Sequence, residues 1–120
     1  MIIEATEDTP KIILDSNTGK MEISNRSLPE DAISFYQPVM DWIKIYSENP
    51  KSETNFIVKL EYYNTSSAKQ IFRVLNKLEE FSERSKIEVN WYFHKDDKDM
   101  LYSGERYAKL VKLKFNLIEY

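Results

Sequence analysis

Two stretches of alternating apolar and polar residues, separated by a helical pattern, constrain the fold of this chain most. Residues Phe56–Tyr62 and Ile87–His94 place apolar side chains at every second position, as strands with one buried face do. Between them, apolar residues recur with helical spacing from Ile71 to Phe81. This order predicts a crossover between two parallel strands. Strands covered on both faces read as continuous apolar runs, so the alternation predicts helices mainly on one face.

The segments on either side extend this unit. A hairpin is predicted from Lys11–Asp15 and Lys20–Ile23, because Gly19 and its neighbours supply turn chemistry between two apolar stretches. A further helix is predicted over about Asp97–Val111, where apolar residues again have helical spacing, followed by a short strand near Lys114–Ile118. These elements would add strands on both sides of the central unit.

A helix before the central unit is predicted to run from Leu28 to Tyr46. Ser27 and Glu30 have the S-x-x-E spacing of a capping box, and Pro29 suits a first turn, where its missing N–H costs little. We therefore expect residues 1–120 to form one two-layer α/β domain. Its mixed sheet would have five strands, with about three helices mainly on one face.

The composition excludes several kinds of chemistry. The chain has no cysteine, one histidine and two glycines, which excludes thiol catalysis, cysteine-bound metals and glycine-rich phosphate loops. Its 17 basic and 20 acidic residues give a net charge of −3, a poor match to a nucleic-acid backbone. Neither a signal peptide nor an apolar membrane span is evident. We expect a soluble cytoplasmic protein that binds no nucleic acid, membrane, metal or cofactor.

Four cap-type side chains occupy Asn64–Ser67, where the first of the two strands turns into the helix. One or two such groups suffice to cap a helix, and Ser67 with Gln70 also fits a capping box. Partners and ligands usually meet α/β domains at the carboxyl ends of strands, so an exposed hydroxyl here is also a functional candidate. Without a neighbouring base it is a poor nucleophile, but it can accept a phosphate from a kinase.

The acidic stretch after the second strand supports an enzyme hypothesis. Asp96, Asp97 and Asp99 follow His94, and carboxylates of this kind could hold a divalent cation. They lack the ligand spacing and the glycine of a calcium loop. The alternative is a helix start, where acids near the first turn interact favourably with the helix dipole. We favour the helix start and predict no metal site.

Two further residues are candidates for partner contacts. Arg26 lies in a loop and could bind a phosphate or a carboxylate in bidentate fashion, although such a loop is usually only solvated. Tyr92 falls on the polar face of its strand beside Glu88 and Asn90. That face, together with Lys59 and Glu61, is expected to be open to solvent.

The motif Tyr62-Tyr63-Asn64-Thr65-Ser66-Ser67 after a strand is the most specific of several segments that follow one another along nearly the whole chain. In these segments the sequence resembles the SiaC family of bacterial regulatory phosphoproteins. Asn25 stands where the family usually has glycine, and Arg106 makes its segment less acidic than usual. The other matching segments are, in order, Thr6–Pro10, Ile12–Asp15, Arg26–Glu30, Phe35-Tyr36 with Trp42, Trp91–Tyr92 and Asp96–Asp97.

The resemblance implies a STAS-like fold and a partner switch similar to that of anti-sigma factor antagonists. A dedicated kinase would phosphorylate Thr65, and a PP2C-type phosphatase would reverse this. The unmodified, non-enzymatic protein would bind and activate a diguanylate cyclase linked to biofilm control through c-di-GMP. The expected partner-binding residues are Arg26, Ser27, Asn64, Ser66, Ser67 and Tyr92.

A small-molecule binding domain is the alternative hypothesis. It would use the carboxyl edge of the sheet near Thr65, and it requires a pocket there that is lined mainly by apolar and aromatic side chains.

Overall fold

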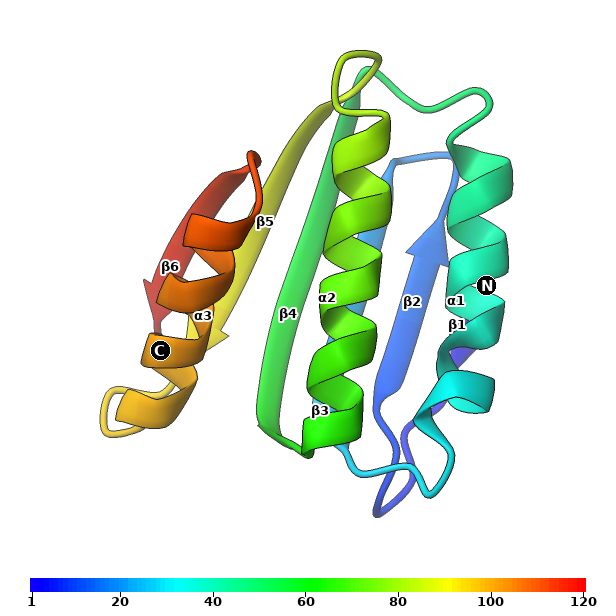
Figure 1. The fold of residues 1–120 in the computed structure, drawn as a ribbon. Helices are drawn as coiled ribbons and strands as arrows, with labels where there is room; N and C mark the ends of the chain where they lie inside the picture. Colours follow the sequence, from blue (N-terminus) through cyan, green and yellow to red (C-terminus); the bar gives the residue numbers. More distant parts are fainter.

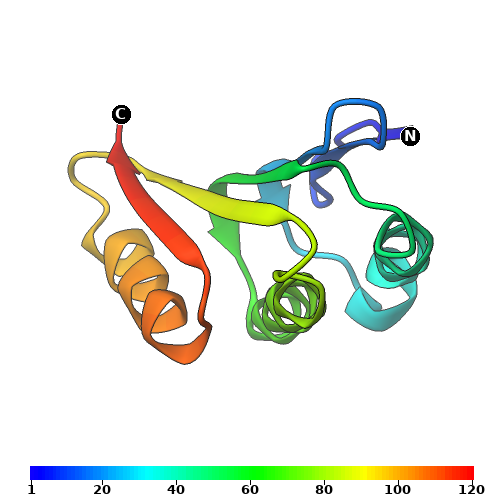
Figure 2. The same cartoon turned by 90° about the horizontal axis from the view of Figure 1, so that it is seen from above.

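The computed structural model describes all 120 residues as a six-stranded sheet with three helices on one face. Figure 1 shows the helices in front of the sheet, and Figure 2 shows all three on the same side of it. This arrangement confirms the predicted two-layer α/β domain. None of the helices is long and apolar enough to cross a membrane.

The strands follow one another across the sheet in the order of the sequence. The first three are antiparallel, whereas the third to the sixth run parallel and are joined through the helices. The elements are β1 (Ile2–Ile3), β2 (Lys11–Asp15), β3 (Lys20–Ser27), α1 (Ala32–Tyr46), β4 (Glu53–Tyr63), α2 (Thr65–Glu80), β5 (Lys86–Phe93), α3 (Lys98–Leu110) and β6 (Lys114–Glu119).

The sheet has one strand more than the five predicted. The additional strand is β1, which has only two residues and pairs Ile2 with Ile13 and Ile3 with Ile12. Two residues are too few to produce an alternating pattern, so this strand had no signature in the sequence.

The predicted start of the first helix was wrong. Asp31 is the N-cap of α1, and its side chain accepts the N–H of Ser34 at 3.1 Å. Ser27 instead ends β3, where it is fully buried opposite Tyr63. The strand continues past Asn25, which has a φ of 78° beside a register shift. Long-range strand pairing therefore took precedence over the local capping pattern.

The core lies between the sheet and the helices. Trp91 of β5 is completely buried there, and its indole N–H donates to the Met100 carbonyl of α3 at 2.9 Å. Gly104 lies against this ring, since a Cβ at that position would come within 2.5 Å of Trp91 Cδ1. This contact brings α3 close to β5 and places the start of α3 beside the carboxyl end of β4.

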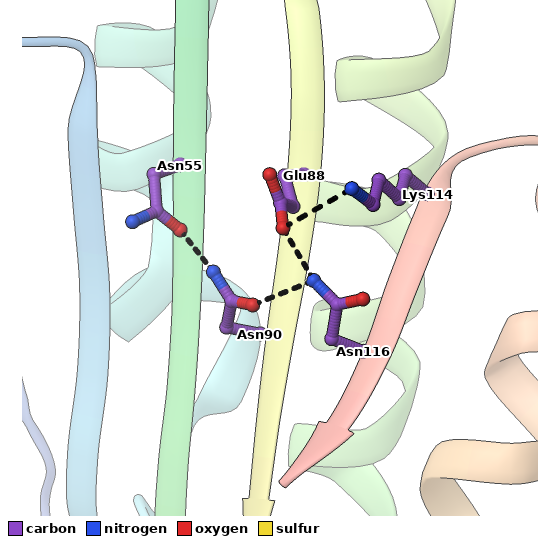
Figure 3. Close-up of polar contacts among 5 residues, drawn as sticks. All are labelled: Asn55, Glu88, Asn90, Lys114 and Asn116. Carbon is purple, nitrogen blue, oxygen red and sulfur yellow. Dashed lines mark hydrogen bonds and ion pairs between the residues drawn. The ribbon is translucent and has the colours of Figure 1, made fainter.

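The opposite face of the sheet carries the polar residues, as predicted. Lys59 and Glu61 are exposed there, and Glu88 and Asn90 are half-buried. Figure 3 shows a hydrogen-bonded network across β4, β5 and β6 on this face. Asn90 donates to Asn55 Oδ1 at 2.6 Å and accepts from Asn116 Nδ2 at 2.9 Å.

Candidate functional site

The carboxyl end of β4 turns directly into α2 through Asn64. The Asn64 side-chain oxygen accepts the backbone N–H of Ser67 at 2.9 Å and the hydroxyl of Ser66 at 3.1 Å. The cap is therefore Asn64, and the capping box predicted for Ser67 and Gln70 does not form. Thr65 is the first residue of the helix, and its side chain is exposed.

A buried hydroxyl cluster lies directly beneath this cap. Ser27 Oγ is 2.7 Å from Tyr36 Oη and 2.8 Å from Ser67 Oγ, and Ser67 Oγ also donates to the Ser27 carbonyl at 3.1 Å. All three side chains have no exposed surface. Burial raises the pKa of Tyr36 to about 12, against a smaller opposing effect of its hydrogen bonds with the two serines. The cluster joins the end of β3 to the starts of α1 and α2.

The four residues Asn64–Ser67 thus divide into two groups. Asn64 and Ser67 have structural roles, because one caps the helix and the other belongs to the buried cluster. Thr65 and Ser66 are exposed. Ser66 donates its hydroxyl to Asn64, whereas the Thr65 hydroxyl has no hydrogen-bond partner within the protein. Both interpretations of the segment, helix cap and exposed hydroxyl, therefore describe parts of it.

A cleft of about 330 Å³ lies beside Thr65, between the end of β4 and the start of α3. Its charged side chains are Glu61, Asp97, Asp99 and Arg106. Four of its eleven lining residues are hydrophobic and four are charged, so the cleft combines apolar and charged surface. Sequence reasoning did not place Arg106 or Asp99 beside Thr65, because α3 approaches the end of β4 only in the folded chain.

The two remaining predicted partner contacts lie on different surfaces. Arg26 is exposed and stands opposite Tyr62 in the β3–β4 register, at the same end of the sheet as Thr65. Tyr92 lies on the open face, where its ring centre is 5.5 Å from Lys59 Nζ. Tyr120 joins them, with its ring centre 4.6 Å from the same ammonium, and was not singled out in the sequence.

The acidic stretch forms a helix start. Asp97 is the N-cap of α3 and accepts the N–H of Met100 at 3.0 Å. His94 packs its ring on Tyr120, with the ring centres 4.1 Å apart. No three acidic or histidine side chains converge in a way that could hold a metal ion.

Comparisons with known proteins agree with this architecture. One similar structure is the crystal structure of the diguanylate cyclase SiaD in complex with its activator SiaC from Pseudomonas aeruginosa. The SiaC chain of that complex superimposes on this protein with a TM-score of 0.93 at 23% sequence identity, and the match covers 100% of this chain and 99% of that chain. The structure of apo-SiaC from the same organism gives a TM-score of 0.88 at 24% identity, covering 98% and 97%. At these identities the likeness shows a shared fold.

Sequence comparison gives the family. An uncharacterized protein of Pseudomonas aeruginosa strain UCBPP-PA14 is 26% identical over 111 residues, covering 92% of this chain and 82% of that protein. The model of the SiaC family of regulatory phosphoproteins matches residues 3–120. Because that match spans nearly the whole chain, this protein belongs to the SiaC family of regulatory phosphoproteins.

Proposed function

We propose that this protein is a phosphorylation-controlled partner of a cytoplasmic diguanylate cyclase. A dedicated kinase phosphorylates Thr65, a PP2C-type phosphatase removes the phosphate, and the unmodified form binds and regulates the cyclase. The family description is that of a regulatory phosphoprotein and not of an enzyme. A solved protein with the same fold is SiaC of Pseudomonas aeruginosa, which was crystallised in complex with the diguanylate cyclase SiaD and is described there as the activator of SiaD. That complex supports the choice of effector.

The observation that carries the choice of Thr65 is its free hydroxyl. Ser67 is buried, and Ser66 is hydrogen-bonded to Asn64. Only Thr65 presents an exposed hydroxyl without an internal partner, at the very start of α2. A kinase needs such a group to be reachable, so the geometry favours Thr65 over its two serine neighbours.

The local electrostatics favour a phosphate at this position without unfolding the helix. Asn64 satisfies the N–H of Ser67, which leaves the first N–H groups of α2 available to an anion. A phosphate there would add about −1.5 to −2 charges near the positive end of the helix dipole. Glu61, Asp97 and Asp99 in the adjacent cleft would oppose it, whereas Arg106 would attract it. The fold should therefore persist while the charge of the surface changes.

The effect of phosphorylation would fall on the partner. A surface complementary to a neutral threonine would have to accommodate a bulky dianion at its boundary with the protein. A loss of a few kcal/mol of binding free energy would weaken the affinity for the partner by roughly 10²–10³-fold, because about 1.4 kcal/mol corresponds to a tenfold change in Kd.

The test is phosphate mapping after incubation with the cognate kinase and ATP. Thr65→Ala should abolish modification, Thr65→Ser should retain it, and Ser66→Ala is the matched control that should be modified normally. The cyclase is then titrated with the unmodified and the phosphorylated protein. A phosphate found on Ser66, or equal affinity of both forms, would contradict the proposal.

The alternative of a small-molecule site near Thr65 has weaker support. Its expected pocket should be lined mainly by apolar and aromatic groups, whereas four of the eleven residues around the 330 Å³ cleft are charged. The cleft suits a protein surface better than a buried ligand.

A further inference from the structure

The most voluminous groove of the protein lies between α1 and α2, away from Thr65. Its volume is about 540 Å³, and the buried side chains of Met40, Ile43 and Phe81 contribute to its lining. The α2 residues that line it start only at Arg73, in the second half of the helix. Thr65 begins the same helix at its other end, so the groove and the capped helix start are separate surfaces. Figure 1 shows α1 and α2 side by side on the helical layer.

Basic side chains dominate the rim of this groove. Four of its eleven lining residues are basic and two are acidic. The other residues of the chain comprise thirteen basic and eighteen acidic ones. The groove therefore carries a local charge of +2 on a chain whose remaining charge is −5. The charged residues of the groove are Lys44, Arg73, Lys77, Arg84, Asp41 and Glu80.

The hydrogen bonds of the rim leave cationic groups available. Lys44 has no ion-pair or hydrogen-bond partner for its ammonium within the protein, whereas the Asp41 carboxylate already accepts from Gln37 Nε2 at 2.9 Å. Arg73 uses one nitrogen, which donates to Gln70 Oε1 at 2.7 Å, and keeps its other donors free. Lys77 pairs with Glu80 at 3.4 Å, but both side chains are exposed, where such pairs are weak.

We infer that this groove binds an acidic segment of a partner protein. Carboxylates along such a segment would reach Lys44 on one side and Arg73 or Lys77 on the other, while an apolar side chain would contact the lining between them. A continuous phosphate backbone fits less well, because Asp41 and Glu80 interrupt the positive rim. The groove binds this acidic segment whether or not Thr65 is phosphorylated.

The test uses two synthetic helical peptides and the full-length, isotope-labelled protein. One peptide carries glutamates along one face with leucines between them, and its companion has glutamine at each glutamate position. Binding is followed by NMR at low salt, which also locates the contact. The groove variant is Lys44→Glu with Lys77→Glu. Its matched control, Lys98→Glu with Lys109→Glu on α3, changes the net charge equally at exposed positions, and circular dichroism verifies that both remain folded.

The glutamate peptide should shift the signals of groove residues and lose at least about tenfold in affinity for the groove variant. The control variant and Thr65→Ala should bind as the natural sequence does. The inference is overturned if the glutamine peptide binds equally well, if both double variants lose the same affinity, or if no groove signal shifts. It is also overturned if GTP or polyphosphate binds the groove more tightly than the peptide, because the site would then recognise phosphate. None of these readouts depends on a kinase, so they are separate from the test of Thr65.

Discussion

Two buried clusters, each made of one tyrosine and two aliphatic hydroxyl side chains, lie at the two ends of α1. At its start, Tyr36 meets Ser27 and Ser67. At its end, Tyr46 Oη lies 2.8 Å from Thr54 Oγ1, which is 2.6 Å from Ser85 Oγ. We refer to them as the Tyr36 cluster and the Tyr46 cluster. The Tyr36 cluster joins α1 to β3 and α2, and the Tyr46 cluster joins α1 to β4 and to the loop residue Ser85.

The two clusters differ in what surrounds them. The Tyr46 cluster is completed by backbone groups of one loop residue, since Lys51 donates its N–H to Tyr46 and accepts from Ser85. The Tyr36 cluster lies beneath a helix start whose next hydroxyls are exposed. The same buried chemistry thus closes the fold at one end and supports the candidate site at the other. Burial, more than residue type, separates the structural hydroxyls from the candidate functional hydroxyl of Thr65.

The largest expected effect comes from Gly19, beside the Tyr46 cluster. Its φ is 75°, and an added Cβ would lie 2.9 Å from Tyr46 Oη and overlap the Glu53 carbonyl. Gly19→Ala should reduce the free energy of unfolding by about 3 kcal/mol or more. The companion is Asn25→Gly at the other positive φ, 78°, which should stay within about 1 kcal/mol of the natural sequence. Urea denaturation gives the free energy of unfolding of both variants. Equal losses of stability in Gly19→Ala and Asn25→Gly would contradict the prediction.

The next effect concerns pH and the Tyr36 cluster. Because burial raises the pKa of Tyr36 to about 12 from 10.0, the unfolded chain loses this proton at lower pH than the folded one. The protonated Tyr36 hydroxyl therefore contributes up to about 2–3 kcal/mol to the free energy of unfolding. This contribution is fully present below pH 10 and is lost as the pH rises toward 12.

The measurement is the free energy of unfolding of the natural chain and of Tyr36→Phe between pH 9 and pH 12. The decline should be shallower in the variant. It should not vanish, because burial also raises the pKa of Tyr107. Identical slopes for both proteins would show that Tyr36 does not titrate as its burial requires.

Removing one hydroxyl from each cluster at neutral pH gives a smaller, matched pair of effects. Tyr36→Phe and Tyr46→Phe should each cost about 1–2 kcal/mol, because each leaves buried polar partners unsatisfied. Thermal denaturation measures both losses. Under the proposed function, only Tyr36→Phe should also change the rate at which a cognate kinase phosphorylates Thr65, since that cluster holds Ser67 under the cap. A rate change of the same size in Tyr46→Phe would remove the distinction between the clusters.

The smallest effect is expected on the open face of the sheet. Asn90→Ala removes the central residue of the network in Figure 3, but the site is only half-buried and water can replace the lost bonds. The cost should be below about 1 kcal/mol by urea denaturation. A loss as large as that of Tyr36→Phe would show that polar contacts outside the core contribute equally.

Sequence patterns predicted the centre of the fold better than its edges. β4, α2 and β5 each have enough residues for their periodicity to show, and each buries one clear face. The start of α1 was mispredicted because the local S-x-x-E pattern at Ser27 competes with strand pairing to Tyr63, a partner distant in sequence. Local patterns do not report such pairings.

The same limit applies to the candidate site. The residue types in Asn64–Ser67 marked the segment, because helix starts and exposed hydroxyls have recognisable side chains. Which hydroxyl is free depends on Tyr36 and Ser27, which reach Ser67 from other elements. The approach of Arg106 and Asp99 depends on how α3 packs, and the α1–α2 groove requires two helices to be placed side by side.

The packing of Trp91 gives the protein an internal optical probe. Its ring contacts Tyr63 and Tyr107, with ring centres 6.2 and 5.4 Å apart, and Tyr63 lines the cleft beside Thr65. The only other indole is Trp42 on α1, so Trp42→Phe isolates the Trp91 emission. Any event at Thr65 that shifts α3 would expose this indole or alter its bond to Met100, and its emission would move to longer wavelength. Phosphorylation could therefore be followed in real time without an attached label.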